Sequence, residues 1–454
     1  MAWSSVNPAT GEVWARHDEH GAGELERRLV LAAAAALRWR RTPVAERSAL
    51  AARVAELLAE RRQRYAALMT REMGKPIAQA EAELDKCAWA FRHYAEHAEQ
   101  LLAPQPARTG AARSCARPEP LGAVLAIMPW NFPFWQVARF LAPNLVLGNV
   151  ALLKHAPNVP GCALAWEELL RDAGAPPGLL QALFVDTATT AQLIADERVR
   201  AVTLTGSARA GRAVGAAAGR ALKKCVLELG GSDAFIVLED ADLERAAQVG
   251  AQARLQNNGQ SCIAAKRFIV HEAVHDEFVA ALRARLQAAP LGDPAERATE
   301  LGPLARDDLR WRLHDQVARS LAAGARCLLG GEPLPGPGYF YPATLLVQVR
   351  PDMAVVAEET FGPVAAVLRA QSEDEAVALA NATPYGLGAS LWTREPERAE
   401  RLLPELEVGM VFVNAMVRSD PRLPFGGVKQ SGFGRELGLP GVTELANLRT
   451  VWID

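Results

Sequence analysis

GAVLAIM at residues 122–128 and NVALLKH at residues 149–155 are short apolar runs, each of a length typical of a buried strand. Three more follow, QALFVD (181–186), VRAVTLT (199–205) and CVLEL (225–229). Amphipathic segments at 135–147, 160–173 and 206–220 separate these runs. Strands that alternate with helices of this size predict βαβ units and a parallel sheet. In such a sheet, ligands bind at the carboxyl ends of the strands.

The chain on either side of this region predicts helices before it and a second α/β lobe after it. Residues 23–41, 44–73 and 77–102 have apolar positions at helical spacing. Strand-like runs recur at 268–270, 324–331, 364–370, 388–393 and 409–414. We therefore expect an α/β protein with a first lobe from residues 1–103 and 121–230 and a second from 231–440. Residues 104–120 and 441–454, which end in a strand that needs a partner, form a small β element.

Composition and charge exclude several classes of function. The 454 residues carry a net charge of −2, which gives no electrostatic reason to expect nucleic acid or an anionic membrane as a partner. The N-terminal residues lack the pattern of a signal peptide, and the apolar runs are too short to span a membrane. The six cysteines show no CxxC spacing, which argues against a disulfide framework. We expect a cytoplasmic protein.

HEAVH at residues 271–275 matches the H-E-x-x-H pattern that places two histidines on one helix face for zinc. His271 directly follows the strand-like RFIV, so the pair straddles a strand–helix junction. A zinc hydrolase is therefore a weak alternative, and no metal site is predicted.

Polar residues stand where several of the predicted strands end. Asn131 lies between two prolines in PWNFP (129–133), Glu228 opens ELGGSD (228–233), and Lys154 ends a strand. A rigidly held amide suits oxyanion stabilisation, and a carboxylate beside an apolar cleft acquires the raised pKa of a general base. Taken singly, Asn131 is better explained as a turn residue, and the charges as solvated.

Two further motifs complete the pattern. TGSARAG (205–211) opens a helix, where free N–H groups can bind a phosphate, although a plain turn explains it equally well. Cys262 lies in NNGQSC (257–262), and a free cysteine is by default a small buried residue. A catalytic role for these residues is favoured over a purely structural one, because several polar groups fall at strand ends of one sheet. A cysteine then follows in a glycine-bearing loop.

The ordered motifs resemble the NAD(P)-dependent aldehyde dehydrogenase superfamily over essentially the whole chain. They are PWNFP, LLKHAP, TGSARAG, ELGGSD, NNGQSC, EETFGPV and PFGGVKQSGFGRELG. REMGKP, KHAPNVP, KKCVLELGGSD and SGFGREL are most similar to the bacterial succinate-semialdehyde dehydrogenases. The resemblance implies an aldehyde dehydrogenase-like fold with two doubly wound Rossmann-type lobes. The first lobe is then the cofactor-binding domain, the second the catalytic domain, and the β element mediates assembly into a homodimer or homotetramer.

Carried over position by position, the resemblance implies that Cys262 is the nucleophile, Glu228 the general base and Asn131 the oxyanion-hole amide. The presence of all three disfavours a non-catalytic module of this fold. The implied cofactor contacts are Trp130, Lys154, Pro157, Gly206, Ser207, Leu229, Glu359 and Phe361, with Phe361 beside the nicotinamide. Pro157 stands where NAD-preferring members often carry a glutamate. A 2′-phosphate is not repelled there, so the expected cofactor is NAD or NADP.

The implied reaction is oxidation of succinate semialdehyde to succinate through a thiohemiacetal and a thioester on the cysteine. Arg139 matches an arginine that binds the substrate carboxylate, but the family's second such arginine is here Gln256. Arg422 and Arg418 are the candidates to supply that charge, and Arg422 is the better placed by sequence. Ala264 stands where some relatives have a second, redox-active cysteine. Glutarate semialdehyde or a broader range of aliphatic aldehydes are the alternative substrates.

Overall fold

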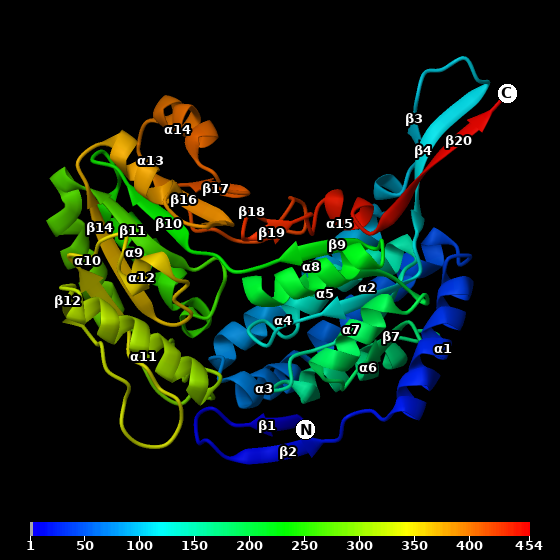
Figure 1. The fold of residues 1–454 in the computed structure, drawn as a ribbon, viewed down its shortest axis with the longest axis horizontal. Helices are drawn as coiled ribbons and strands as arrows, with labels where there is room; N and C mark the ends of the chain where they lie inside the picture. The colour runs from blue at the N-terminus through cyan, green and yellow to red at the C-terminus, as the bar shows by residue number, and fades with distance from the viewer. Residues whose placement is uncertain (1–2) are drawn as a thin grey trace.

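The computed structural model describes residues 3–454, and its first lobe is built on a six-stranded sheet (Figure 1). The strand order is β19-β9-β8-β5-β6-β7. The five predicted strands are confirmed and run parallel: β5 (Ala123–Ile127), β6 (Val150–Lys154), β7 (Leu180–Ala182), β8 (Val199–Thr205) and β9 (Lys224–Glu228). The connecting helices are α5 (Trp135–Leu147), α6 (Pro160–Asp172), α7 (Thr187–Ala195) and α8 (Ala208–Arg220).

Four helices from the N-terminal part of the chain pack on this lobe: α1 (Ala22–Trp39), α2 (Val44–Glu60), α3 (Arg62–Met73) and α4 (Ile77–Leu101). The single helix predicted over 44–73 is wrong, because the backbone leaves the helical region at Arg61 (φ −99°, ψ 14°). The Arg61 guanidinium bonds to Asp172 and Glu168 on α6. A short hairpin of β1 (Trp3–Val6) and β2 (Val13–His17) precedes the helices.

The second lobe contains a seven-stranded sheet in the order β12-β13-β14-β11-β10-β16-β17. Five of its strands were predicted: β11 (Ala265–His271), β12 (Arg326–Leu329), β14 (Val364–Ala370), β16 (Gly388–Trp392) and β17 (Met410–Val413). β10 (Asp233–Val237) and β13 (Thr344–Val347) were not predicted. The helices are α9 (Leu243–Leu255), α10 (His275–Ala288), α11 (Asp307–Ala322), α12 (Ala354–Ala357), α13 (Glu373–Asn381) and α14 (Pro396–Leu402).

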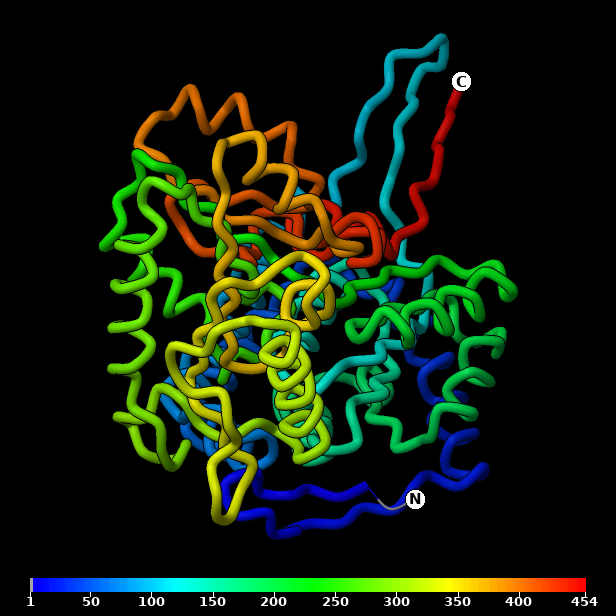
Figure 2. The backbone as a smooth tube through the Cα atoms, turned by 60° about the vertical axis from the view of Figure 1, so that its left-hand side comes forward, coloured from blue at the N-terminus to red at the C-terminus, as the bar shows by residue number. Residues whose placement is uncertain are grey.

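A three-stranded antiparallel arm projects from the body of the molecule (Figures 1 and 2). It comprises β3 (Gln105–Pro106), β4 (Arg113–Pro120) and β20 (Ala446–Ile453), which follows α15 (Pro440–Thr443). β20 pairs with β4 along its whole length, from Ala446 opposite Pro120 to Ile453 opposite Arg113. The two segments expected to form a separate β element therefore do pair with each other.

The last part of the second lobe returns to the first. β15 (Tyr385–Gly386) pairs with β18 (Val428–Lys429), and β19 (Gly432–Phe433) then pairs with β9 as an edge strand of the first sheet. The sequence placed β19 with the second lobe, since a two-residue strand carries no periodicity. Within residues 3–454 no helix is long and apolar enough to cross a membrane.

The chain crosses directly from the first sheet to the second between β9 and β10, at Leu229–Ser232. Two glycines in this crossing allow residues of the second lobe to pack directly against its backbone. A Cβ on Gly231 would lie 2.5 Å from the carbonyl oxygen of Cys262, and one on Gly230 would lie 2.6 Å from Oε2 of Glu359. Absence of a side chain here lets second-lobe residues approach the carboxyl end of β9.

Candidate active site

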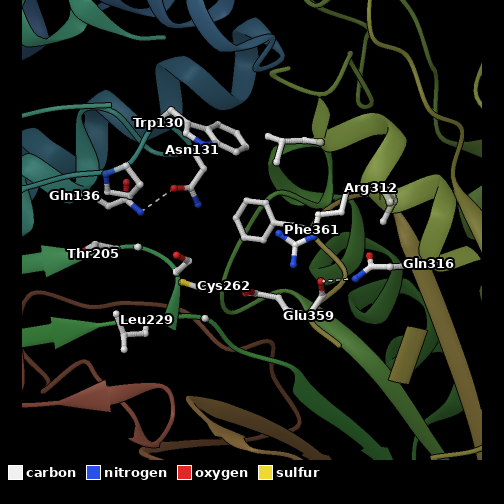
Figure 3. A pocket seen from close by; sticks show the side chains of 16 residues that line it. Trp130, Asn131, Gln136, Thr205, Leu229, Cys262, Arg312, Gln316, Glu359 and Phe361 are labelled. Carbon is white, nitrogen blue, oxygen red and sulfur yellow. Dashed lines mark hydrogen bonds between the residues drawn. The ribbon is translucent and has the colours of Figure 1, made fainter. Parts of the chain in front are cut away.

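A cavity of about 180 Å³ lies where the two lobes meet (Figure 3). The first lobe contributes the ends of its strands and the loops that follow them, and the second lobe contributes the cysteine loop and one helix. The lining side chains used below are Trp130, Asn131, Gln136, Thr205, Ser207, Leu229, Cys262, Arg312, Glu359 and Phe361. The sequence-predicted residues Cys262 and Asn131 thus face the same cavity.

The loop that presents Cys262 begins at a left-handed turn. After α9, Asn257 and Asn258 adopt φ values of 57° and 59°, a conformation that asparagine tolerates better than most residues. Their side chains are buried: Asn258 Nδ2 donates to the carbonyls of Gly74 and Pro303, and Asn257 Nδ2 donates to the carbonyl of Asn131. These bonds tie the cysteine loop to the oxyanion-hole candidate.

Lys266 lies beneath this loop and was missed by the sequence analysis. It is fully buried, and its Nζ donates to the carbonyl oxygens of Ser261 at 2.9 Å and Cys262 at 2.7 Å. Burial raises the pKa of the Cys262 thiol to about 12, while the positive charges of Arg139 and Lys266 act in the opposite direction. The thiol is therefore the resting form, and the two cations favour the thiolate.

Two hydrogen bonds orient the side-chain amide of Asn131, and a third is accepted by its backbone carbonyl. Its Oδ1 accepts from Gln136 Nε2 at 3.0 Å, and its Nδ2 donates to the carbonyl of Gln260 at 3.0 Å (Figure 3 shows the first). Its own carbonyl accepts from Asn257. An amide nitrogen has two N–H groups, so one remains to stabilise an anion formed at Cys262.

Glu228 ends β9, directly before the cavity residue Leu229. Its carboxyl group is buried, and neither oxygen has a hydrogen-bond partner among residues 3–454. One oxygen lies so close to Gly426 that a Cβ there would be 2.5 Å away. Burial raises the pKa of Glu228 well above its usual range, with Arg139 opposing the effect. Burial therefore favours the neutral carboxyl at this position, and exposure to water would lower its pKa again.

Six of the eight predicted cofactor contacts line the cavity: Trp130, Gly206, Ser207, Leu229, Glu359 and Phe361. The Trp130 and Phe361 rings meet edge to face, with centroids 5.7 Å apart. Ser207 caps α8 by accepting from the N–H of Ala210, so the first N–H groups of that helix face outward. Glu359 accepts from the N–H of Gly231 at 3.0 Å.

The other two predicted contacts, Lys154 and Pro157, lie at and after the end of β6. Lys154 is largely buried, and its Nζ lies 5.4 Å from the centre of the Trp3 ring. Burial lowers the pKa of Lys154. The helix N–H groups and the cation can bind the phosphates of a dinucleotide, and the aromatic pair offers an apolar surface beside them. Arg312 on α11, which the sequence analysis missed, is a cation that lines the cavity itself.

The three arginines predicted to bind the substrate lie outside the cavity that holds Cys262. Arg139 is buried, pairs with Glu436, donates to Thr205 Oγ1 at 3.1 Å and lies over the Phe425 ring. Arg422 is exposed and bonds to Asp420 at 2.7 Å. Arg418 is also exposed. None of the three lines the cavity that holds Cys262, and Arg422, which the sequence favoured, is drawn to the surface by its neighbour Asp420.

The two histidines of HEAVH have separate neighbours. His271 ends β11, and its Nε2 lies 3.9 Å from a Glu239 oxygen. His275 begins α10 and contacts Asp276 and Arg369. Over residues 3–454, no group of three or more His, Cys, Asp or Glu side chains is placed to hold a metal ion.

The fold and the site define an enzyme class with two Rossmann-type lobes and a cysteine in the cavity at their junction. The family model described as the aldehyde dehydrogenase family matches residues 2–451, and the chain belongs to this family. It is 50% identical over 453 residues to a probable succinate-semialdehyde dehydrogenase [NADP(+)] of Synechocystis sp., with both chains fully covered. It is 48% identical over 456 residues to succinate-semialdehyde dehydrogenase [NADP(+)] 1 of Mycobacterium tuberculosis, again with full coverage.

A solved structure gives the same picture. The crystal structure of succinic semialdehyde dehydrogenase from Streptococcus pyogenes, in complex with NADP+, superimposes with a TM-score of 0.97 at 38% identity and covers both chains completely. The predicted fold class and the predicted family are thereby confirmed.

Proposed function

We propose that this protein oxidises succinate semialdehyde to succinate with NADP, and accepts NAD. The observation that carries the proposal is the convergence of Cys262 and Asn131 on one cavity, beside a set of dinucleotide-binding donors. The substrate and the cofactor preference follow from relatives about 50% identical over the full chain that are named for both. The lack of a carboxylate at Pro157, next to Lys154, is compatible with a 2′-phosphate.

The cofactor would be held by the start of α8 at Ser207, by Glu359 and by the Trp130–Phe361 pair, with Lys154 and Arg312 available to its phosphates. When bound, the nicotinamide accepts the hydride that leaves the aldehyde carbon. The apolar surfaces of Leu229 and Phe361 exclude water from that part of the cavity, which protects the reaction from solvent.

The chain's own residues carry the covalent chemistry. The Cys262 thiolate attacks the aldehyde carbon, and the free N–H of Asn131 donates to the resulting oxyanion. Oxidation of this adduct leaves an acyl thioester on Cys262. Glu228 then turns from its buried position toward the cavity, takes a proton from water, and the hydroxide hydrolyses the thioester to the acid.

The arm supports a proposal on the assembly of the enzyme, and the cysteines support one on its cellular location. We propose assembly into a homodimer or homotetramer through the arm, whose β20 leaves Leu448, Trp452 and Ile453 exposed. All six cysteines are free, a state expected in the reducing cytoplasm.

A steady-state comparison tests the proposal. Succinate semialdehyde, glutarate semialdehyde and butanal are each oxidised with NADP and with NAD, and the acid product is identified. The proposal requires that kcat/KM for succinate semialdehyde with NADP exceeds every other combination. A higher value for glutarate semialdehyde or for butanal would assign the enzyme to one of the alternative substrates.

A further inference from the structure

A second and larger cavity, of about 740 Å³, lies on the other side of the PWNFP segment. The first turn of α5 separates the two cavities: Asn131 and Gln136 line the cavity that holds Cys262, whereas Phe132 and Trp135 line the larger one. Gln256, just before the cysteine loop, also faces the larger cavity. Phe132 adjoins Asn131 in the chain and Trp135 adjoins Gln136, so the larger cavity lies directly across this segment from the cavity that holds Cys262.

Three cations line this larger cavity, and two of them have acidic partners. Lys75 is fully buried and forms an ion pair with Glu83, which also accepts from the N–H groups of Phe134 and Trp135. Arg285 pairs with Glu244 at 3.2 Å. The third cation, Lys86, has no carboxylate within ion-pair distance among residues 3–454. A cation held without a counter-ion at a cavity wall is a ready site for an anionic ligand group.

The Lys86 ammonium is held in place by neutral groups. It donates to Ser419 Oγ at 2.7 Å and lies 4.4 Å from the centre of the Trp135 ring. An ammonium has three N–H donors, and the bond to Ser419 uses one. Burial and the charge of Arg139 lower the pKa of Lys86 to about 8, so the group remains mostly cationic at neutral pH.

The remaining polar side chains of the wall suit a small ligand with one charged end. Four glutamines line the cavity: Gln79, Gln248, Gln252 and Gln256. They can donate hydrogen bonds and carry no charge, and the one carboxylate of the wall besides Glu83 is the exposed Glu300. Phe132 and Trp135 supply an apolar surface for a short methylene chain between the reacting carbon and Lys86.

We propose that Lys86 binds the carboxylate of the aldehyde substrate and thereby sets the enzyme's preference for semialdehydes over uncharged aldehydes. This inference rests on the proposed function. It also explains how segment 418–422, which the sequence predicted to supply a cation, acts: Ser419 from this segment contacts Lys86, while Arg418 and Arg422 remain at the surface.

The test compares Lys86→Met and Lys86→Arg with the wild-type enzyme. Arg92→Gln is the matched control, because it removes a positive charge from the exposed side of the same helix. For Lys86→Met we expect KM for succinate semialdehyde to rise about 10–100-fold, as loss of a charged hydrogen bond implies, while KM for butanal changes little. kcat with butanal should stay near the wild-type value, and Lys86→Arg should retain most of the preference. An equal rise in KM for both aldehydes would overturn the inference.

A second measurement separates this inference from the choice of physiological substrate. Butanal oxidation is inhibited with 4-hydroxybutanoate, which has the carboxylate and chain length of the semialdehyde but no aldehyde. Inhibition that weakens about 10–100-fold in Lys86→Met and is unchanged in Arg92→Gln supports the carboxylate site, even if the wild-type enzyme prefers another aldehyde. Equal inhibition constants in the wild-type and Lys86→Met enzymes, or no inhibition of the wild-type enzyme, would overturn it.

Discussion

Lys266 Nζ donates to the carbonyl oxygen of Cys262 at 2.7 Å, so the predicted nucleophile is held by a buried cation four residues further along the chain. The same ammonium also donates to Ser261. It therefore has two effects on Cys262, because it fixes the loop backbone and its charge favours the thiolate.

Replacing Lys266 should lower the reactivity of the Cys262 thiol and leave cofactor binding intact. In Lys266→Met the pKa of Cys262 rises further, and a rise of one unit lowers the thiolate fraction about tenfold. We expect the rate of alkylation by iodoacetamide and kcat to fall together by at least this factor, with NADP binding retained. Lys266→Arg keeps the charge and should recover part of both rates. Unchanged alkylation in Lys266→Met would refute a role for its charge.

Removing the base should stop the reaction after its first half. Glu228→Gln cannot take a proton from water, so the acyl thioester on Cys262 should accumulate. We expect a burst of about one equivalent of reduced cofactor per active site, followed by turnover slowed about 10²–10⁴-fold. Cys262→Ala, the matched control, should show no burst and still bind NADP. A full steady-state rate in Glu228→Gln would assign the base elsewhere.

Glu228→Gln should also change how the stability of the protein depends on pH. Burial raises the pKa of Glu228 in the folded state, so the folded protein keeps a proton that the unfolded chain releases. The contribution of Glu228 to stability is therefore fully present below its unfolded pKa of about 4.5 and is lost as the pH rises toward its folded pKa. Glu228→Gln cannot titrate, so its Tm should decline less between pH 5.5 and 8 than that of the wild-type protein. Thermal melts across this range measure the difference, and parallel Tm curves would contradict it.

The sequence predicted the site where motifs fall at the ends of parallel strands, because topology alone brings those ends together. Asn131 was singled out in this way, whereas the role of Cys262 came from the resemblance to the aldehyde dehydrogenases. Lys86 could not be predicted from the sequence, because it lies on a helix far from Cys262 in the chain. No neighbouring residue indicates which face of α4 lines the cavity. The ion pair of Arg422 with Asp420 depends on the folded geometry, so the sequence did not show it. Lys266 did carry a signal: together with Arg267 it is a charged residue in a strand that is buried along most of its length.

The ion pair between Lys75 and Glu83 should stabilise the loop that presents Asn131. Both side chains are almost fully buried, and Glu83 accepts from the N–H groups of Phe134 and Trp135 at 2.9 and 2.8 Å. Glu83→Gln leaves the Lys75 charge unpaired, which typically costs about 3–5 kcal/mol. We expect a clearly lower Tm and a reduced kcat. Adding Lys75→Met should restore part of the Tm without restoring kcat, because the loop N–H groups still lack a carboxylate. Recovery of both would show that Glu83 serves only to neutralise Lys75.

The arm should control assembly without supporting the fold of the lobes. β20 pairs with β4 along its whole length, yet Leu448 and Trp452 on it are 53% and 55% exposed. Apolar side chains on a projecting antiparallel sheet are a surface that a second copy would cover. Leu448→Asp combined with Trp452→Asp should therefore reduce the molar mass measured by light scattering to that of a smaller species. The pairing of β4 with β20 uses backbone groups and is retained, so the far-ultraviolet circular dichroism should not change. Leu222→Asp, which alters an exposed leucine outside the arm, is the control. An unchanged molar mass in the double variant would place the interface elsewhere.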